Sequence, residues 1–487
     1  MSLRDQLRNV DPCRRLWSTQ DGGTYTANRL LDELNTVGET LNRLPRRVAI
    51  VATSSLDLAW LLLVLDGALE QISIVPSGVD QTTRNRLLKS SGANGVICCE
   101  NAPVTEFFPA VRLKSINSTN PIAVGKLGKS SAEFALGSPQ GNATKRTGQA
   151  TRWQMCTSGT SGPRKWVSHT LRSLTKSLKR NTEAGAKFRW ASIYDLSSFA
   201  GLQVFLQSWY AGSELLMVDH QEPIQDRVNF LADSGCNAVS ATPSTWRVLL
   251  MSTAIASLRL KQVTLGGEPA DQLILDTLQR TFPDSRVTHI YASTEAGAGF
   301  AISDTREGFP ASYLHTPPRG LELCVSSNST LLIRPECFDQ HYAGSKRPIQ
   351  NADGFIDSGD LVRRQADRFV FCGRADGVIN VGGRKVHPFE VESCLLRHDS
   401  VSMAHVFARR SPIVGSLVQA HVVLRTGLSP TREIKTSLMN HCRGHLQPHQ
   451  VPASLRIVDS LQLSDNGKLR RATQESSDPK TFTTVSN

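Results

Sequence analysis

Short apolar runs alternate with longer amphipathic segments over the first 300 residues. β-Branched runs at 47–53, 72–76 and 95–99 predict buried strands, and segments 56–69 and 81–91 predict the helices between them. The alternation continues further along the chain. Strands are predicted at 153–156, 190–194, 214–218, 238–241, 262–265 and 287–291, and helices at 171–183 and 199–210. Strands that alternate with helices indicate an α/β fold built on parallel sheets.

The pattern changes from about residue 321. Short strands are predicted at 331–334 and 367–371. A compact unit follows, with helices predicted at 388–398 and 431–446 and strands at 402–408 and 417–424. We therefore place a boundary at 373–376 and expect a large N-terminal α/β domain, 1–373, and a small C-terminal α+β domain, 377–487.

Composition narrows the class of protein. The net charge is +12, from 55 basic and 43 acidic residues, and no run of five like charges occurs. Scattered positive charge suits anionic small molecules, and we expect no nucleic-acid partner. The ten cysteines form no CxxC pair, and the first residues lack the apolar core of a signal peptide, so we expect reduced thiols in the cytoplasm. The apolar stretch 56–69 is too short to span a bilayer, so no membrane segment is expected.

A polar loop after the strand predicted at 153–156 is the strongest chemical signal. Six consecutive residues are only Thr, Ser or Gly, and a lysine, Lys165, follows three positions later. They are Thr157, Ser158, Gly159, Thr160, Ser161 and Gly162. Backbone N–H groups, hydroxyls and one lysine together suit a polyphosphate. The loop is not a Walker loop, because no Gly-Lys-Ser/Thr closes it, and a flexible linker is the alternative.

Further motifs follow in order. GGEP (266–269) and YASTEAG (291–297) each come at the end of a predicted strand, where open α/β sheets bind ligands. GFIDSGDLV (354–362), FCGRADGVINVGGRKVHPFEVE (371–392) and LSDNGKLRR (463–471) come later. This order and spacing, over about residues 45–472, resembles the adenylate-forming superfamily of acyl-CoA synthetases, luciferases and non-ribosomal-peptide adenylation domains.

The resemblance implies that a carboxylate attacks the α-phosphate of ATP, giving an acyl-adenylate and pyrophosphate. The polar loop and Lys165 would hold the β- and γ-phosphates, and Glu295 would bind Mg²⁺, a hard cation that prefers oxygen ligands. The remaining implied contacts are a phosphate bond from Thr294, adenine between Tyr291 and the Gly267–Glu268 segment, and ribose contacts from Asp360 and Arg374.

The C-terminal motifs carry implied roles in the same family. Lys468 matches the mobile lysine that bridges the carboxylate and the α-phosphate. Asp376 matches the hinge about which the small domain rotates, and Gly383 matches the glycine that a pantetheine arm passes. One departure concerns the polar loop, which ends GPRKW where the family usually has Gly-x-Pro-Lys-Gly. Trp166 thus replaces a glycine, which leaves the exit path of the loop open.

The acyl pocket is less defined. Segment 193–205, which includes Phe199, stands where related ligases carry an aromatic residue followed by His. Asp195 takes that place, or Ser198 does if the helix is aligned from Gly201. Asp195 is expected either to recognise an amine or to cap the following helix. The segment is also similar to amide-bond synthetases such as coronafacate ligase, so a carboxylic acid and ATP are expected substrates, with CoA or an amine as acceptor.

Two other patterns are weaker. His441, His445 and His449 recur at helical spacing beside Cys442, which could suggest zinc. Because Pro448 interrupts the helix and the family's small domain has no expected metal, we do not predict a site there. RADG at 374–377 resembles the KxDG motif of nucleic-acid ligases, but Arg374 stays protonated and cannot be their nucleophile.

Overall fold

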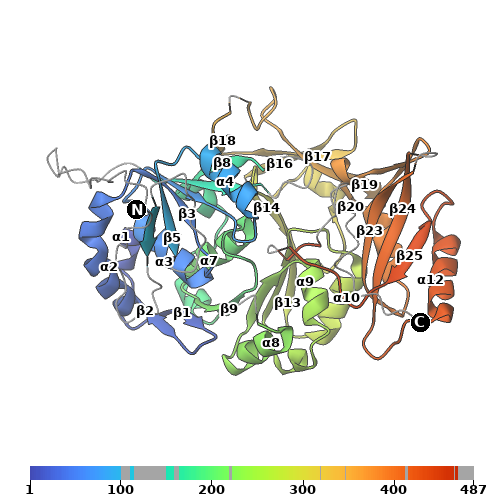
Figure 1. Cartoon of the computed structure of the whole chain (residues 1–487), viewed down its shortest axis with the longest axis horizontal. Helices are drawn as coiled ribbons and strands as arrows, with labels where there is room; N and C mark the ends of the chain where they lie inside the picture. The colour runs from blue at the N-terminus through green and yellow to red at the C-terminus, as the bar shows by residue number, and fades with distance from the viewer. Residues whose placement is uncertain are drawn as a thin grey trace.

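The computed structural model describes residues 1–99, 110–113, 150–157, 164–218, 222–318, 320–345, 347–411, 415–464 and 467–469. The predicted α/β class is confirmed, with a large N-terminal part and a small C-terminal domain. Figure 1 shows the small domain, coloured orange and red, at one end of the elongated molecule. The N-terminal helices and strands, coloured blue, lie at the other end.

Sheet I is the sheet that carries the polar loop. Its order is β18-β8-β7-β4-β3-β5-β6, and β3 to β7 are parallel whereas β8 and β18 are antiparallel additions. The strands are β3 (Arg47–Val51), β4 (Gln71–Ile74), β5 (Gly95–Cys99), β6 (Ala110–Leu113), β7 (Arg152–Cys156), β8 (Trp166–Thr170) and β18 (His341–Tyr342). The predicted strands at 47–53, 72–76, 95–99 and 153–156 are confirmed, and β8 is an additional strand.

Sheet II holds the GGEP and YASTEAG motifs. Its order is β14-β13-β12-β11-β9-β10-β1-β2, with antiparallel strands only at the two edges. The strands are β1 (Arg15–Thr19), β2 (Thr24–Thr26), β9 (Arg189–Ser192), β10 (Glu214–Met217), β11 (Ala238–Ala241), β12 (Gln262–Gly266), β13 (Arg286–Ser293) and β14 (Gly297–Ile302). The carboxyl ends of β11, β12 and β13 are adjacent, so the loops that follow them meet at one edge.

The largest core joins these two sheets. Helix α3 (Ser55–Leu65) is buried along nearly its whole length, because an almost unbroken apolar run follows its N-cap, Ser54. It packs in one cluster with α7 (Phe199–Ala211) and strands of both sheets. The other helices of this part are α1 (Leu3–Leu7), α2 (Ala27–Arg43), α4 (Gln81–Ser90), α5 (Leu171–Thr175), α6 (Thr182–Gly185), α8 (Ile224–Asp233), α9 (Pro243–Leu249) and α10 (Gln272–Thr281).

One predicted helix is wrong. The segment 171–183 forms two short helices, α5 and α6, because Asn181 caps a new helix by accepting a hydrogen bond from Ala184 N. Asparagine at such a position favours a helix start over a helix interior. The remaining predicted helices, at 56–69, 81–91, 199–210, 388–398 and 431–446, correspond to α3, α4, α7, α11 and α12 within a few residues.

The rest of the chain forms two smaller sheets. Sheet III has the order β15-β20-β19-β17-β16, and the small domain has β22-β21-β24-β23 with β25 on β24. The strands are β15 (Phe309–Pro310), β16 (Leu321–Val325), β17 (Thr330–Pro335), β19 (Ile356–Gln365), β20 (Arg368–Arg374), β21 (Ile379–Val381), β22 (Arg384–Val386), β23 (Val401–Ser411), β24 (Gly415–Leu424) and β25 (Ser454–Ile457). Helices α11 (Pro388–Leu396) and α12 (Arg432–His445) cover the small domain's own core.

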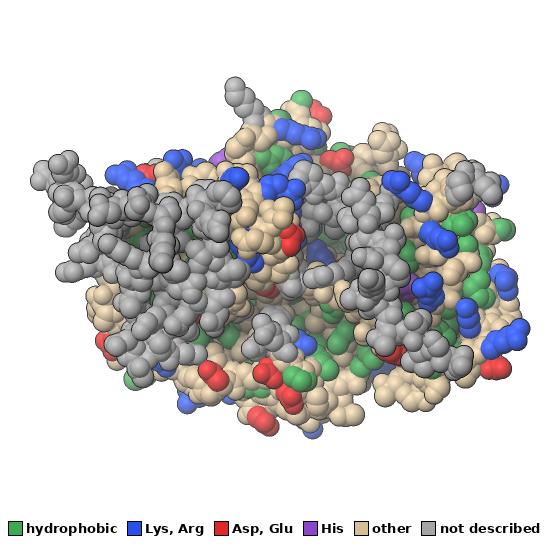
Figure 2. Space-filling view, in the orientation of Figure 1, with side chains coloured by type: hydrophobic (Ala, Val, Ile, Leu, Met, Phe, Trp, Pro, Cys, Tyr) green, Lys and Arg blue, Asp and Glu red, His purple; other side chains and the backbone are tan. Residues whose placement is uncertain are grey.

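The surface agrees with the scattered charge of the sequence. Figure 2 shows Lys and Arg side chains spread over the visible face, including the small domain, rather than gathered in one patch. Among the described residues, no helix combines the length and the apolar character that crossing a membrane requires.

Candidate active site

The Lys468 side chain lies against the GGEP loop. A Cβ on Gly267 would be 3.1 Å from Cε and 3.7 Å from Nζ of Lys468, and Gly267 has a φ of +81°. The positive φ favours glycine here, and the absence of a side chain lets the end of the lysine approach closely. Burial lowers the pKa of the Lys468 ammonium, and the carboxylates of Glu268 and Asp360 act against that shift. The structure thus brings the C-terminal lysine to the edge of sheet II.

Three side chains of the N-terminal part, Thr242, Thr245 and Glu268, hold the backbone beside Lys468, and we call them the lysine clamp. The hydroxyls of Thr242 and Thr245 both donate to the Gly467 carbonyl, the second at 3.0 Å. Glu268 Oε1 accepts from Leu469 N at 3.1 Å, and its Oε2 accepts from Ser244 N at 3.0 Å. These bonds fix the lysine loop to the start of α9.

Sequence reasoning missed Thr242 and Thr245. Thr242 follows β11 and precedes a proline, which signals a helix N-cap, and its hydroxyl accepts from Thr245 N at 3.0 Å. Nothing in that local signal indicates a partner more than 200 positions away. The second function of the two hydroxyls becomes visible only in the folded chain.

We expect Glu268→Gln to slow the adenylation half-reaction about tenfold or more, because the amide loses the charge and one acceptor of the clamp. Transfer from a supplied acyl-adenylate should stay near the parent rate. Single-turnover measurement of the two half-reactions checks this, with the exposed Glu183→Gln as the matched control. Equal slowing of both half-reactions would contradict the clamp.

Tyr291 and Asp360 form a second group beside the lysine. The Tyr291 hydroxyl donates to Asp360 Oδ2 at 2.6 Å. Its ring stacks with the rings of Phe300 and Phe371, whose centroids are 5.2 and 5.3 Å away. The predicted stacking of adenine against this tyrosine stays a prediction. The Tyr291 hydroxyl also positions the Asp360 carboxylate.

Asp360 and Arg374 lie opposite each other on β19 and β20. Arg374 Nη1 is 3.5 Å from Asp360 Oδ1, and Arg374 Nε is 3.4 Å from Asp376 Oδ1. Burial raises the pKa of Asp360, whereas the Tyr291 hydroxyl and the Arg374 charge oppose that rise. The pair therefore offers one carboxylate and one guanidinium side by side, and their ribose contacts stay a prediction.

Glu295 lies in the turn between β13 and β14, next to Thr294. Both side chains are partly exposed, and Ser293 Oγ closes the turn by accepting from Ala296 N at 3.0 Å. Burial acts to lower the pKa values of Lys468 and Arg374, and the negative charge of Glu295 acts to raise them. Burial is the main cause of the raised pKa of Tyr342, and the Glu295 charge adds to it. An accessible carboxylate among these groups is a suitable oxygen ligand for Mg²⁺.

The base of the polar loop is a hairpin between β7 and β8. Thr157 N donates to the Lys165 carbonyl at 2.9 Å, and Lys165 N donates to Thr157 Oγ1 at 3.1 Å. The Lys165 ammonium lies 5.1 Å from the centroid of the Tyr342 ring. Lys165 and Glu295 therefore share Tyr342 as a neighbour. The other predicted loop residues, Ser158, Gly159, Thr160, Ser161 and Gly162, lie outside the described residues.

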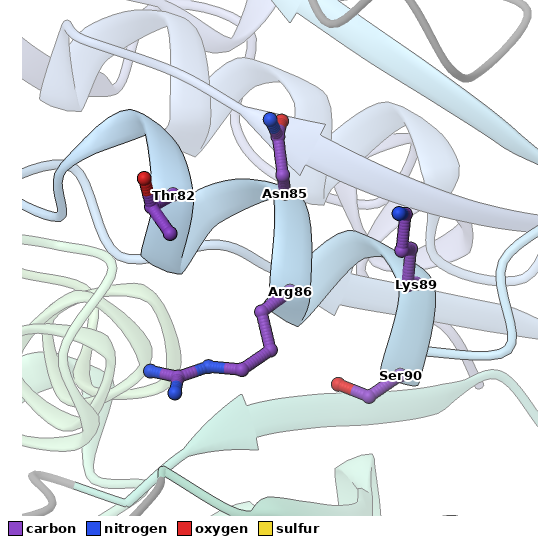
Figure 3. Close-up of a pocket in the computed structure, with 5 residues that line it drawn as sticks. All are labelled: Thr82, Asn85, Arg86, Lys89 and Ser90. Carbon is purple, nitrogen blue, oxygen red and sulfur yellow. The ribbon is translucent and has the colours of Figure 1, made fainter.

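Trp166, which replaces the glycine usual in the family, has a structural role at the end of this loop. Its backbone pairs with Cys156, and its buried indole donates to the Leu87 carbonyl at 3.1 Å. The exit path left open by the sequence is therefore β8, anchored on α4. Figure 3 shows a surface depression lined by five residues of this helix alone, Thr82, Asn85, Arg86, Lys89 and Ser90. It includes no predicted site residue.

The predicted acyl segment leads into α7. Ser198 is the N-cap of that helix and accepts from Gly201 N at 3.0 Å, so the expectation that Asp195 caps it is wrong. The Asp195 carboxylate accepts instead from the Ser77 hydroxyl and, at 2.6 Å, from Ser197 N. A Cβ on Gly201 would be 2.1 Å from the Asp195 carbonyl oxygen, so only glycine fits there.

Phe199 and His169 lie together beside this segment, with ring centroids 5.8 Å apart. Burial lowers the pKa of His169 to about 4, so its ring is neutral at physiological pH. Asp376 lies at the boundary to the small domain, and Gly383 lies within that domain. Asp376 is in the short 3₁₀ helix Ala375–Gly377, and Gly383 is in the turn between β21 and β22 with open space around it.

Two family models match most of the chain. Residues 10–331 match the model of the AMP-binding enzyme family, and residues 390–468 match its AMP-binding enzyme C-terminal domain. The match begins well before residue 45, where the sequence resemblance was placed.

The relatives found by sequence have low identity to this chain, but the matches cover most of it. The uncharacterized acyl–CoA ligase YtcI of Bacillus subtilis is 23% identical, over 94% of this chain and 91% of that protein. The 4-hydroxybutyrate–CoA ligase 1 of Metallosphaera sedula is 25% identical over 65% of this chain, and the match spans 60% of its length. ATP-bound MatB from Rhodopseudomonas palustris has the same fold, with a TM-score of 0.75 and 18% identity over 96% of this chain and 97% of that one. The chain belongs to the adenylate-forming AMP-binding enzyme family.

Proposed function

We propose that this protein activates a carboxylic acid with ATP to give an acyl-adenylate and pyrophosphate, and then transfers the acyl group to CoA. The observation that carries the proposal is the position of Lys468. Its side chain lies on Gly267 and within electrostatic range of Glu268, Asp360 and Glu295. A lysine held there supplies positive charge where two anions, the carboxylate and the α-phosphate, must meet.

Each remaining group has a task in this first half-reaction. The backbone and hydroxyls of the 157–162 loop, with Lys165, would hold the β- and γ-phosphates. Asp360 would accept from the ribose hydroxyls, with Arg374 donating beside it and Tyr291 holding the carboxylate in place. Thr294 would bond a phosphate oxygen through its hydroxyl.

Magnesium fits the same site. Glu295 is the carboxylate that would hold it, because it is accessible and stands near Lys468 and Arg374, where phosphate charge would collect. The ion would neutralise phosphate charge as pyrophosphate leaves.

For the second half-reaction, we infer that the small domain turns about Asp376 and brings Gly383 toward the acyl-adenylate. Open space around Gly383 leaves room for a pantetheine arm. The relatives named as CoA ligases favour CoA as the acceptor. The ten free cysteines suit a reducing compartment such as the cytoplasm.

The second candidate acceptor is an amine. Asp195 favours it, since a partly exposed carboxylate can orient an ammonium group or accept its proton before attack. The bonds from Ser77 and Ser197 argue for a positioning task instead, because they hold each carboxylate oxygen on a residue of this chain. Ser198 caps α7, so its hydroxyl is already used. Phe199 is therefore more suitable than Ser198 as part of the wall of an acyl pocket.

The acceptor experiment supplies acid, ATP and magnesium with either CoA or a set of amino acids, and identifies the product by mass. We expect a thioester with CoA and no amide. Asp195→Ala should then reduce thioester formation and pyrophosphate exchange together, while the exposed Asp233→Ala should match the parent. Amide without thioester, with Asp195→Ala impairing amide formation far more than exchange, would establish the amine instead.

A further inference from the structure

We propose that the small domain binds a zinc-class divalent ion through Cys394, His441 and His445. The site is separate from the nucleotide-binding residues and does not depend on the proposed reaction. It would link α11, which carries the cysteine, to α12, which carries both histidines.

The three donor atoms are already close together. Each residue offers one ligand atom, and the three atoms lie within 4.8 Å of one another. Tetrahedral zinc with nitrogen and sulfur ligands needs donors about 3.5 Å apart, so each atom would move inward by less than about 1 Å. Side-chain rotation can supply a shift of this size because His445 is exposed and His441 is only partly buried.

Hydrogen bonds from both imidazoles to backbone carbonyls fix the rings. His441 Nε2 lies 3.0 Å from the Cys394 carbonyl oxygen, and His445 Nδ1 lies 2.8 Å from the His441 carbonyl oxygen. A carbonyl only accepts, so each of these nitrogens carries the hydrogen and the other nitrogen of each ring keeps its lone pair. Metal-binding histidines are commonly held by such bonds.

The surroundings favour a soft ion over magnesium. The donors are one thiol and two imidazoles, a set that suits zinc and has no carboxylate. The buried Cys442 thiol is hydrogen-bonded to the Cys394 sulfur, and His398 packs edge-on against His441 at 5.4 Å. Arg397 also interacts with the Cys394 sulfur, but its side chain is exposed and can turn toward solvent.

The sequence could not indicate this set. Its helical spacing pointed to His441, His445 and His449, but α12 ends at His445 and leaves His449 outside the helix. The third ligand, Cys394, is 47 positions before His441 and reaches it only because α11 packs on α12.

The test uses the full chain, stripped with a chelator and titrated with Zn²⁺ against a chromophoric chelator, without ATP or Mg²⁺. We expect one equivalent per chain and a rise in the thermal unfolding midpoint, since the ion binds the folded state. His445→Ala should weaken binding at least about tenfold and abolish the thermal shift. The control, His449→Ala, should behave as the parent.

Cobalt identifies the sulfur ligand. Co²⁺ in place of Zn²⁺ should give a thiolate-to-cobalt charge-transfer band in the parent that Cys394→Ser lacks. If Cys394→Ser fails to fold, the exposed His445→Ala decides the question. Parent-like binding by His445→Ala would overturn the proposal and indicate an adventitious ion only, held by exposed thiols such as Cys13, Cys324 or Cys337. Absence of stoichiometric binding by the parent would overturn it equally.

Discussion

Lys468→Ala should lower the rate of acyl-adenylate formation about a hundredfold or more, the loss typical of removing one transition-state donor. The lysine clamp holds the backbone on both sides of Lys468, so that its ammonium lies at the GGEP loop. The variant removes that positive charge and leaves the bonds to the backbone of Gly467 and Leu469. Transfer from a supplied acyl-adenylate should remain largely intact, because the lysine serves only the first half-reaction.

Single-turnover assays of the two half-reactions measure this difference. Lys435→Ala, which removes an exposed lysine of the same domain, is the matched control and should match the parent. If Lys468→Ala slowed both half-reactions equally, the effect would lie in folding or docking and Lys468 would not have the proposed role.

Glu295→Gln should raise the magnesium concentration needed for half-maximal adenylation strongly, with a much smaller effect on the concentration of acid required. The amide keeps the size of the side chain and removes the charge that holds the cation. A magnesium titration of adenylation at fixed ATP and acid checks this. The exposed Glu336→Gln serves as control, and a Glu295→Gln titration that overlays the parent's would show that Glu295 is not the ligand.

Much of the fold could be predicted because its strands are short apolar runs bounded by polar loops. The runs at 95–99 and 238–241 match β5 and β11 at both ends. Strand β8 was missed because its sequence, WVSHT, mixes polar and apolar residues and is defined by pairing with β7. Such pairing depends on tertiary contacts rather than on local propensity.

The candidate site, too, could be predicted only in part. Motifs that lie at strand ends, such as GGEP around Gly267, could be placed from the sequence because parallel strands end at one edge. What could not be read were contacts between distant segments. The aromatic pair stacked with Tyr291, the hydroxyls of Thr242 and Thr245, and the approach of Cys394 to His441 all depend on the folded chain.

Exchange of labelled pyrophosphate into ATP, measured with a panel of carboxylic acids and magnesium, tests the central claim most directly. The account predicts exchange that requires both an acid and magnesium, forward turnover that yields AMP, and loss of exchange in Lys468→Ala. Acid-dependent turnover that yields ADP and phosphate, with no pyrophosphate exchange, would contradict it.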